Sequence, residues 1–520
     1  MGIRQNFNST KSFITRHKVV LSLGLGSVIV MLWTLVRFFD LPTIYDMVTQ
    51  QLIARSWAHG IVAPIQMGPT NYLLKVVLIY MPLEFLPGSA RAHIIFSTLA
   101  INVITFLLLY VVVTRLIREI APKLKPQLYR SMLWLSLVAG SVFWIQFANS
   151  RNLEVVGGCF LIERALRYKR LPTQRLGAFI VLYSAVLFFA DPLQIYMTAM
   201  PAAIFLYIDA RKPLPRRVLF IALLLALGAI ISKLIFKLVA SVASITFIGG
   251  SQLSARWTPT LLLKAAFRSL REVIALTAGK SELGVPYQLL LVCVVILALY
   301  LFVRSVLKGY VPRKVALFTG TFIVSNLVVY TLSGQSLQPG TSRYLIMIVP
   351  ALMIILATLK DELTSREFKI KPLITVLAAS AVACLLSLLF TWHPSQRSDQ
   401  RLEKINQNII AANYTHVYGS MDTALPLDYY LNTESPRIAA LACSPDGLVL
   451  ALSKPMLSSL ETDDEAAVIF DGQSIANSPF VCSADMLIGR LGKPIRSLQT
   501  AGGNQVLVYP DRLLSGVLSR

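Results

Sequence analysis

The sequence predicts a polytopic α-helical membrane protein with a soluble C-terminal domain, and three observations support this fold class. Of the 520 residues, 55% are hydrophobic and only 14% are charged, and the mean hydropathy is +0.64. Soluble globular proteins carry about 25% charged residues, so an ordinary soluble enzyme is excluded. Apolar runs extend from about Val19 to Trp392, and only Ser395–Arg520 forms a long polar stretch. We therefore expect a membrane domain over residues 1–393 and a separate domain over 394–520.

The apolar runs predict about eleven transmembrane helices, because a helix needs roughly 20 apolar residues to cross the bilayer core. The fourth and sixth runs are short, and Glu163 and Arg164 interrupt the fourth. The expected spans are 19–38, 93–114, 131–149, 152–168, 176–193, 195–209, 217–242, 287–307, 314–333, 344–360 and 372–392.

Basic residues between these runs predict the orientation, because Lys and Arg accumulate in short cytoplasmic loops. The N-terminus and all even-numbered connections carry such clusters, which lie in 4–18, 115–130, 167–175, 211–217, 304–314 and 360–371. The N-terminus is therefore expected in the cytoplasm, and the odd-numbered connections and the C-terminal domain outside it. The net charge of +23 then reports mainly orientation, and it does not indicate a nucleic-acid partner.

The first outward connection, residues 40–91, contains two early carboxylates, Asp40 and Asp46. A helical stretch, Met47–His59, follows them, and an amphipathic segment, Tyr72–Phe85, is expected to lie along the membrane interface. The two carboxylates are either loop acids that cap helices or candidates for a general base. His59 is a candidate for lining a cavity.

Further polar residues lie near the outer ends of other spans. Ionisable groups next to hydrocarbon are costly and usually face a protein cavity, a partner or water. A guanidinium group can also hold a phosphate by two parallel hydrogen bonds. Both kinds of residue also have a purely structural alternative. An arginine can simply anchor the end of a span, and an aspartate before a proline can end a helix. The phosphate-binding candidates are Arg151, Arg343, Lys233 and Lys237, and the cavity-lining candidates are Asn152, Glu154, Asp191 and Tyr344.

The seventh connection is outward yet basic, which opposes the orientation rule. Lys264, Arg268 and Arg271 lie within an amphipathic stretch, Trp257–Ala275. They are expected to bind either the phosphate of a lipid substrate or anionic lipid headgroups.

The polar tail is expected to form an α/β or α+β domain. It contains a candidate helix, Gln400–Ala412, and a series of short apolar segments typical of strands. Cys443 and Cys482 both lie in this tail, where an oxidising compartment would permit a disulfide. The five histidines are scattered, so the sequence predicts no metal site and no required cofactor, although a divalent metal stays possible. The candidate strands are 416–418, 437–442, 447–451, 467–470 and 505–509.

The order of motifs resembles a known family. Asp46 after the first span is followed by Ala54, Ala58 and Gly60. Pro64 and the stretch Pro69–Tyr72 come next, and this stretch resembles a second interfacial helix. Arg343 and Tyr344 resemble an Arg-Tyr pair that opens a late span. The chain, over nearly its whole length, thus resembles integral-membrane glycosyltransferases of the GT-C fold, especially bacterial relatives of protein O-mannosyltransferases and of the lipid A aminoarabinose transferase. The family often has a Glu after the acid, and Met47 stands there in this sequence.

The resemblance implies an inverting glycosyltransferase at the outer face of a bacterial inner membrane. Its donor would be a polyprenyl-phosphate-linked sugar, and its acceptor a glycan, lipid or protein of the cell envelope. Asp46, or alternatively Asp40, would be the general base, and Arg343 would hold the donor phosphate. Two other classes stay open: a glycan ligase or polymerase that uses a polyprenyl-diphosphate donor, and a non-enzymatic lipid flippase or transporter.

Overall fold

The computed structural model divides into two compact units, which are described separately. Unit one comprises 1–38, 99–233 and 251–393, and unit two comprises 39–98, 234–250 and 394–520. The structure describes residues 45–58, 65–67, 73–88, 90–124, 126, 130–131, 134–135, 151–210, 216–242, 245–247, 258–278, 285–333, 337, 345–359, 414, 416–419, 424, 427–428, 437–444, 447–451, 465–469, 482–499 and 505–510.

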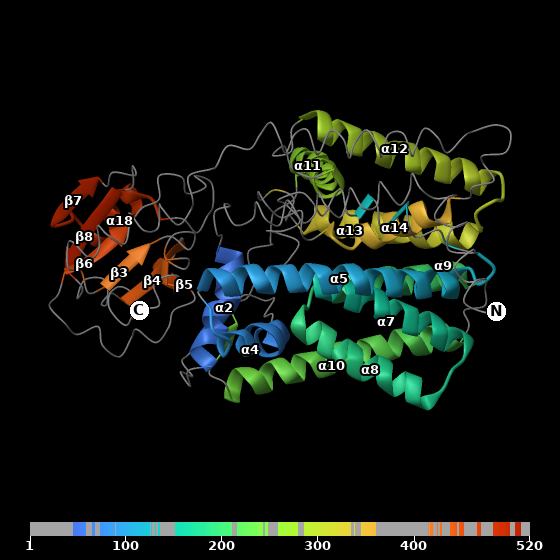
Figure 1. Ribbon diagram of the computed structural model, residues 1–520, viewed down its shortest axis with the longest axis horizontal. Coiled ribbons are helices and arrows are strands. Elements are labelled where there is room, and N and C mark those ends of the chain that lie inside the picture. The colour runs from blue at the N-terminus through green and yellow to red at the C-terminus, as the bar shows by residue number, and fades with distance from the viewer. Residues whose placement is uncertain are drawn as a thin grey trace, which may run out of the picture. The chain divides into compact units, whose positions relative to one another are not determined.

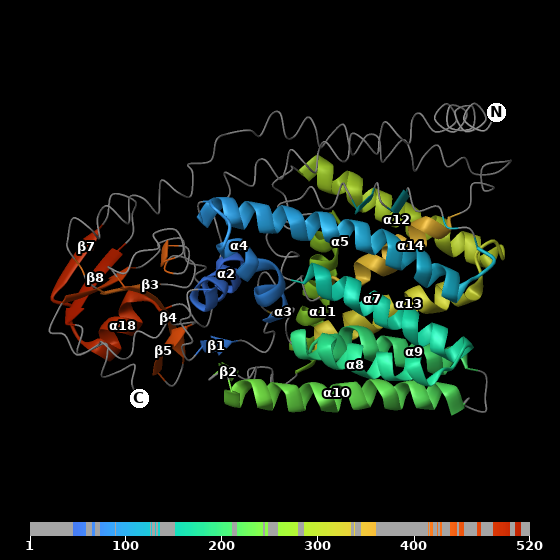
Figure 2. The same ribbon diagram turned by 60° about the horizontal axis from the view of Figure 1, so that its bottom comes forward.

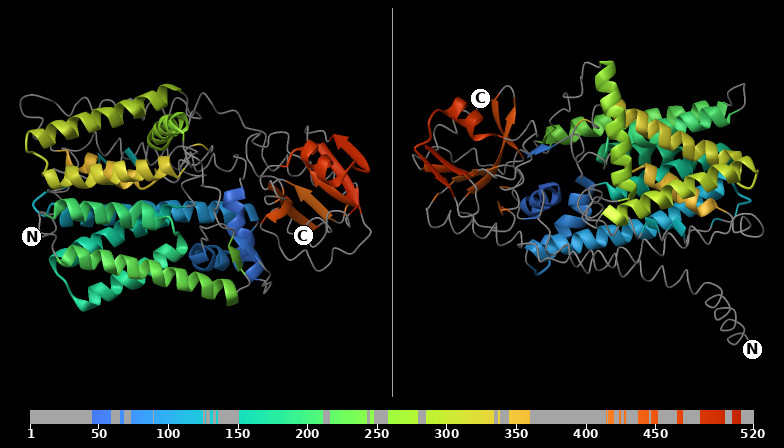
Figure 3. Two further views of the ribbon diagram at one scale, coloured as in Figure 1. Left: turned by 180° about the vertical axis from the view of Figure 1, so that it is seen from behind. Right: turned by 90° about the horizontal axis from the view of Figure 1, so that it is seen from above.

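The membrane part is helical, and its helices in unit one run roughly parallel to one another, apart from α11 (Figures 1 and 3). Three helices of the described chain are long and apolar enough to cross a membrane: Arg216–Ser241, Gln288–Leu307 and Arg313–Leu332. The chain is therefore a helical membrane protein. The helices, of which α5 begins and α10 ends in unit two, are α5 (Ala90–Ile120), α7 (Asn152–Arg170), α8 (Gln174–Ala190), η4 (Ile195–Ala199), α9 (Met200–Asp209), α10 (Arg216–Val242), α11 (Pro259–Ala278), α12 (Val285–Leu307), α13 (Arg313–Leu332) and α14 (Ile348–Thr358).

Helices cover eight of the eleven expected spans within the described residues. The expected spans 19–38 and 372–392 lie outside those residues, as does most of 131–149. The number of spans thus stays a prediction.

Helices α14 and α10 differ in how much of their surface is buried. Every residue of α14 is buried, as expected of a helix that is apolar on all sides and packed within a bundle. In contrast, α10 exposes a stripe that includes Leu223, Leu227 and Ile230, and this stripe is suited to contact lipid tails. On its packed side, a Cβ at Gly228 would lie 1.9 Å from Ser184 Oγ, so the absence of a side chain lets α10 approach α8 closely.

Ion pairs join the even-numbered connections. Asp209 Oδ2 accepts a hydrogen bond from Lys169 Nζ (2.7 Å) and lies 3.0 Å from Lys314 Nζ. Arg170 Nη2 donates to Glu119 Oε1 (2.9 Å). These residues belong to the second, fourth, sixth and eighth connections or to the helix ends beside them.

Contacts also join the odd-numbered connections with one another. In unit one, Arg151 of the third connection pairs with Asp191 of the fifth, and Arg268 Nη1 of the seventh donates to the Leu337 carbonyl of the ninth (2.6 Å). In unit two, strands of the first and seventh connections pair in parallel, namely β1 (Ile65–Met67) and β2 (Ile245–Phe247). In the numbering of the eleven expected spans, these contacts join odd-numbered connections with one another.

The C-terminal region contains a six-stranded mixed sheet (Figure 2). The strand order is β5-β4-β3-β6-β8-β7; β3 pairs in parallel with β4 and β6, and the other pairs are antiparallel. All five expected strands coincide with strands of this sheet, whereas the expected helix Gln400–Ala412 lies outside the described residues. The elements are β3 (His416–Gly419), β4 (Arg437–Ser444), β5 (Gly447–Ala451), β6 (Glu465–Ile469), α18 (Ala484–Leu491), β7 (Arg496–Gln499) and β8 (Gln505–Pro510).

Tyr509 of β8 links the sheet to the turn after α18. Its side chain is fully buried, its Oη donates to the Gly492 carbonyl (3.1 Å), and burial raises the pKa of the phenol. Replacing Tyr509 by Phe should cost about 1 kcal/mol of the sheet's unfolding free energy. Because the folded state holds the proton more tightly, the wild-type sheet should lose stability as pH rises above about 10, and the variant should lack this loss. Thermal unfolding followed by the infrared signal of β-sheet measures the loss of stability and its pH dependence. If the stability difference between the wild type and the variant were the same from pH 8 to 11, the raised pKa of Tyr509 would be contradicted.

Candidate functional site

Asp46 lies in the first turn of a helix of the first outward connection. That helix, α2 (Tyr45–Ala58), confirms the helical stretch expected here, and Asp46 is its second residue. A carboxylate is favoured there by the positive end of the helix dipole. The structure describes the backbone of Asp46 and not its side chain.

The second half of the connection is also helical, over Leu73–Glu84. It consists of α3 (Leu73–Lys75), the π-helical turn η2 (Val76–Tyr80) and α4 (Met81–Glu84), and it packs against α2. The segment expected over Tyr72–Phe85 is thus helical, and its position along the membrane interface stays a prediction. Lys75 is only 3% exposed, so this segment carries a buried cation.

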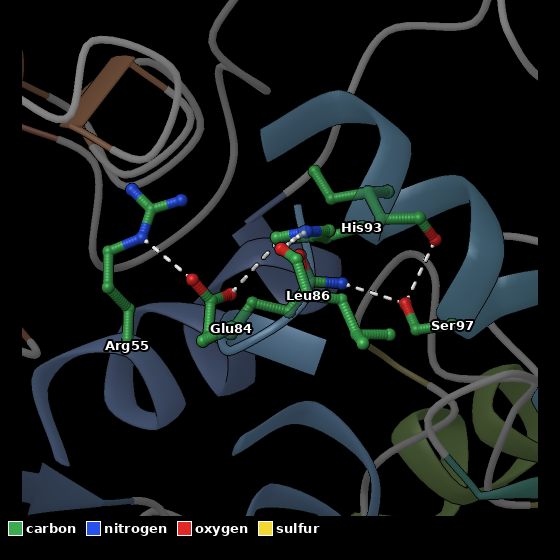
Figure 4. Close-up of polar contacts among 7 residues, drawn as sticks. Arg55, Glu84, Leu86, His93 and Ser97 are labelled. Carbon is green, nitrogen blue, oxygen red and sulfur yellow. Dashed lines mark hydrogen bonds and ion pairs between the residues drawn. The ribbon is translucent and has the colours of Figure 1, made fainter. Parts of the chain in front are cut away.

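A buried polar cluster joins the two helical segments to the first turn of α5 (Figure 4). Arg55 Nε donates to Glu84 Oε2 (3.2 Å), and Glu84 Oε1 lies 3.8 Å from His93 Nδ1. The Leu86 carbonyl accepts a hydrogen bond from His93 Nε2 (3.2 Å). The side chains of Arg55 and Glu84 are 8% and 5% exposed. The cluster therefore fixes α2, which carries Asp46, relative to α4 and α5.

A hydrogen bond extends the cluster along α2. Gln51 Nε2 donates to Ser97 Oγ (3.0 Å), and Ser97 Oγ donates to the Ile94 carbonyl (2.9 Å). These contacts, which involve Arg55, Glu84, His93 and Gln51, were not predicted from the sequence. The available signal was the presence of Lys75 and Glu84 in an otherwise apolar segment, since buried charges need partners.

The buried polar cluster of Arg55, Glu84 and His93 should stabilise α2 and α4. Replacing Glu84 by Gln removes the carboxylate that faces both Arg55 and His93, so we expect a local loss of about 2 kcal/mol. Hydrogen exchange of α2 and α4 peptides in the full chain measures it. The matched control is Glu119→Gln, because its partner Arg170 is 55% exposed and exposed pairs contribute about 0–1 kcal/mol. Equal exchange in the two variants would contradict a structural role for Glu84.

A second buried network lies in unit one, at the ends of α7 and α8. Arg151 Nη1 donates to Asp191 Oδ2, and the two side chains are 1% and 0% exposed. Gln194 Nε2 donates to the same oxygen (3.1 Å), and Gln194 Oε1 accepts a hydrogen bond from Thr198 Oγ1 (2.6 Å). A Cβ at Gly158 would lie 2.6 Å from Thr198 Oγ1, so a glycine is needed where α7 passes the network. Asp191 also caps α8, as one of the sequence alternatives proposed.

The structure brings together two of the expected site residues, Arg151 and Asp191. Glu154 is buried in the first turn of α7, and Asn152 begins that helix. Lys233 and Lys237 lie on the exposed side of α10. The remaining expected site residues lie outside the described part of the chain: Asp40, His59, Arg343 and Tyr344. Their assignments stay predictions.

The cysteines differ in state. Cys482 is disulfide-bonded, whereas Cys159 and Cys293 are free thiols. Cys443, its expected partner, lies in β4, but its side chain is outside the description, so the pairing stays a prediction.

Neither a metal cluster nor a similar protein identifies the activity. Among the residues that the structure describes, no three His, Cys, Asp or Glu side chains are grouped to hold a metal ion. No protein-family model matches the chain, and no curated protein matches it.

Proposed function

We propose that the protein is a glycosyltransferase that moves a sugar from a polyprenyl-phosphate donor to an acceptor at the outer face of the cytoplasmic membrane. The observation that carries the proposal is the position of Asp46 in the first turn of α2, a helix fixed by the buried Arg55–Glu84 pair. A general base needs such a fixed position, because proton transfer depends on its distance from the acceptor.

The proposed reaction is a single displacement with inversion. The Asp46 carboxylate accepts the proton of an acceptor hydroxyl or amine, whose oxygen or nitrogen attacks the anomeric carbon. The bond from that carbon to the phosphate oxygen breaks, and polyprenyl phosphate leaves with the bonding electrons. Arg343 holds the phosphate by two parallel hydrogen bonds, which stabilise the charge that develops on it.

Three observations support the outward placement of this chemistry. The contacts between connections join even with even and odd with odd, as alternating crossings require. The even connections are basic, which favours the cytoplasm. The disulfide at Cys482 favours an oxidising compartment for the C-terminal region. The first connection, with Asp46, would then lie on the same side as that region.

The proposal is tested with purified full-length protein, lipid donors and extracted cell-envelope glycans and lipids as acceptors. We expect release of polyprenyl phosphate and a product of inverted anomeric configuration. Sugar is supplied in parallel on polyprenyl phosphate and on polyprenyl diphosphate. Consumption of the diphosphate donor alone would replace the proposal by a ligase or polymerase. Lipid movement across vesicles without any product would replace it by a flippase.

A further inference from the structure

Helix α11 presents three different faces around its axis. At 3.6 residues per turn, Ala265, Ser269 and Leu276 share one face, and all three are buried. Ser269 Oγ shares a hydrogen bond with Thr331 Oγ1 of α13 (2.8 Å). This narrow face of small and apolar residues attaches α11 to the bundle.

The second face is apolar and exposed. Leu263, Phe267 and Leu270 are 60%, 67% and 57% exposed. They lie on one side of the helix, together with Ile274. Burying such a face in hydrocarbon is favourable by about 25 cal/mol per Å² of apolar surface, so it needs an apolar environment.

The third face is basic, and it adjoins the apolar one. Lys264, Arg268 and Arg271 project within about one sixth of a turn of one another and are exposed. No carboxylate within the described chain pairs with these three residues, including Glu272, the one acid of this helix. Arg268 donates to the Leu337 carbonyl (2.6 Å), which holds that side chain near the end of α13.

The axis of α11 crosses the neighbouring helices. Figure 1 shows α11 nearly end-on, whereas α12 and α13 run lengthwise beside it. A helix that crosses the spans in this way lies along the membrane surface, where apolar residues face the acyl chains and basic residues face the phosphates.

We infer that α11 is an interfacial helix that binds anionic phospholipid headgroups through Lys264, Arg268 and Arg271. The charge complementarity favours a lipid surface over a soluble partner, because the cations border the apolar face instead of surrounding a separate site. Each base near an anionic surface contributes about 1 kcal/mol at physiological ionic strength. The inference is independent of the proposed glycosyl transfer, which involves other residues.

The test is hydrogen exchange of α11 peptides in the full-length protein within nanodiscs. Discs of phosphatidylcholine are compared with discs that also contain phosphatidylglycerol. We expect exchange to slow by about tenfold or more with the anionic lipid, and by less than twofold with inorganic phosphate added to phosphatidylcholine discs. The triple variant Lys264→Gln, Arg268→Gln, Arg271→Gln should lose the slowing.

A matched triple variant removes the same charge elsewhere. Arg118→Gln, Lys123→Gln, Arg175→Gln changes three exposed bases outside α11 and should keep the slowing. Phe267→Asp, which alters a side chain 67% exposed, should speed α11 exchange in both kinds of disc. Equal exchange of α11 peptides in the two kinds of disc would overturn the inference. So would a slowing by phosphatidylglycerol in the α11 triple variant as large as in the wild type.

Discussion

Replacing Asp46 by Asn is expected to lower kcat/KM for transfer from a polyprenyl-phosphate sugar by about 10³-fold, because the acceptor then lacks a general base. The amide is nearly isosteric with the carboxylate, so α2 should still fold and donor binding should persist. Arg343→Ala should lower kcat/KM by at least about 30-fold, because the leaving phosphate loses its hydrogen-bond donors. Arg343→Lys should recover part of this loss, since lysine keeps the charge without the planar fork.

Asp40→Asn decides which acid is the base. If Asp46 has this role, the Asp40 variant should retain most of the activity, and the reverse pattern would reassign the base. Glu119→Gln controls for the general effect of removing a carboxylate, since Glu119 pairs with Arg170 and belongs to neither the first connection nor the proposed site. Full activity in both Asp46→Asn and Arg343→Ala would refute the proposed mechanism.

Apolar periodicity and length predicted the helices well where charges end the apolar run. The expected span 287–307 corresponds to α12 (Val285–Leu307), and 314–333 corresponds to α13 (Arg313–Leu332). The prediction was less accurate for α5, which continues to Ile120 although the apolar run ends near residue 114. Arg115 and Arg118 are good helix formers, so a helix can extend beyond the hydrocarbon that limits the apolar run.

The partners of buried charges could not be predicted in the same way. Arg55 and Glu84 are 29 positions apart, and Arg151 and Asp191 are 40 apart. The sequence identified Arg151 and Asp191 as separate candidates at the outer ends of spans. It could not show that one neutralises the other, because the pairing depends on how α7 and α8 pack and not on any local pattern.

This pairing gives the largest expected effect on stability. Asp191→Asn removes the carboxylate that pairs with Arg151, a side chain 1% exposed, and puts a neutral amide in its place. Removing one partner of a buried ion pair typically costs about 3–5 kcal/mol. We expect a loss of this size in the unfolding free energy, measured by thermal unfolding of the full chain in detergent. Arg170→Gln serves as the control, because it breaks the ion pair with Glu119, in which the Arg170 side chain is 55% exposed. It should lower the unfolding free energy by less than about 1 kcal/mol.

The double variant Arg151→Met, Asp191→Leu separates a structural pair from a phosphate site at Arg151. Replacing both charges by apolar residues removes the cost of burying either charge alone, so stability should return to within about 1–2 kcal/mol of the wild type. If the pair is only structural, the double variant should also keep the wild-type thermal shift on adding polyprenyl phosphate. If Arg151 also binds the donor phosphate, stability should recover while that shift disappears. A cost below about 1 kcal/mol for Asp191→Asn would show that Arg151 does not depend on this carboxylate.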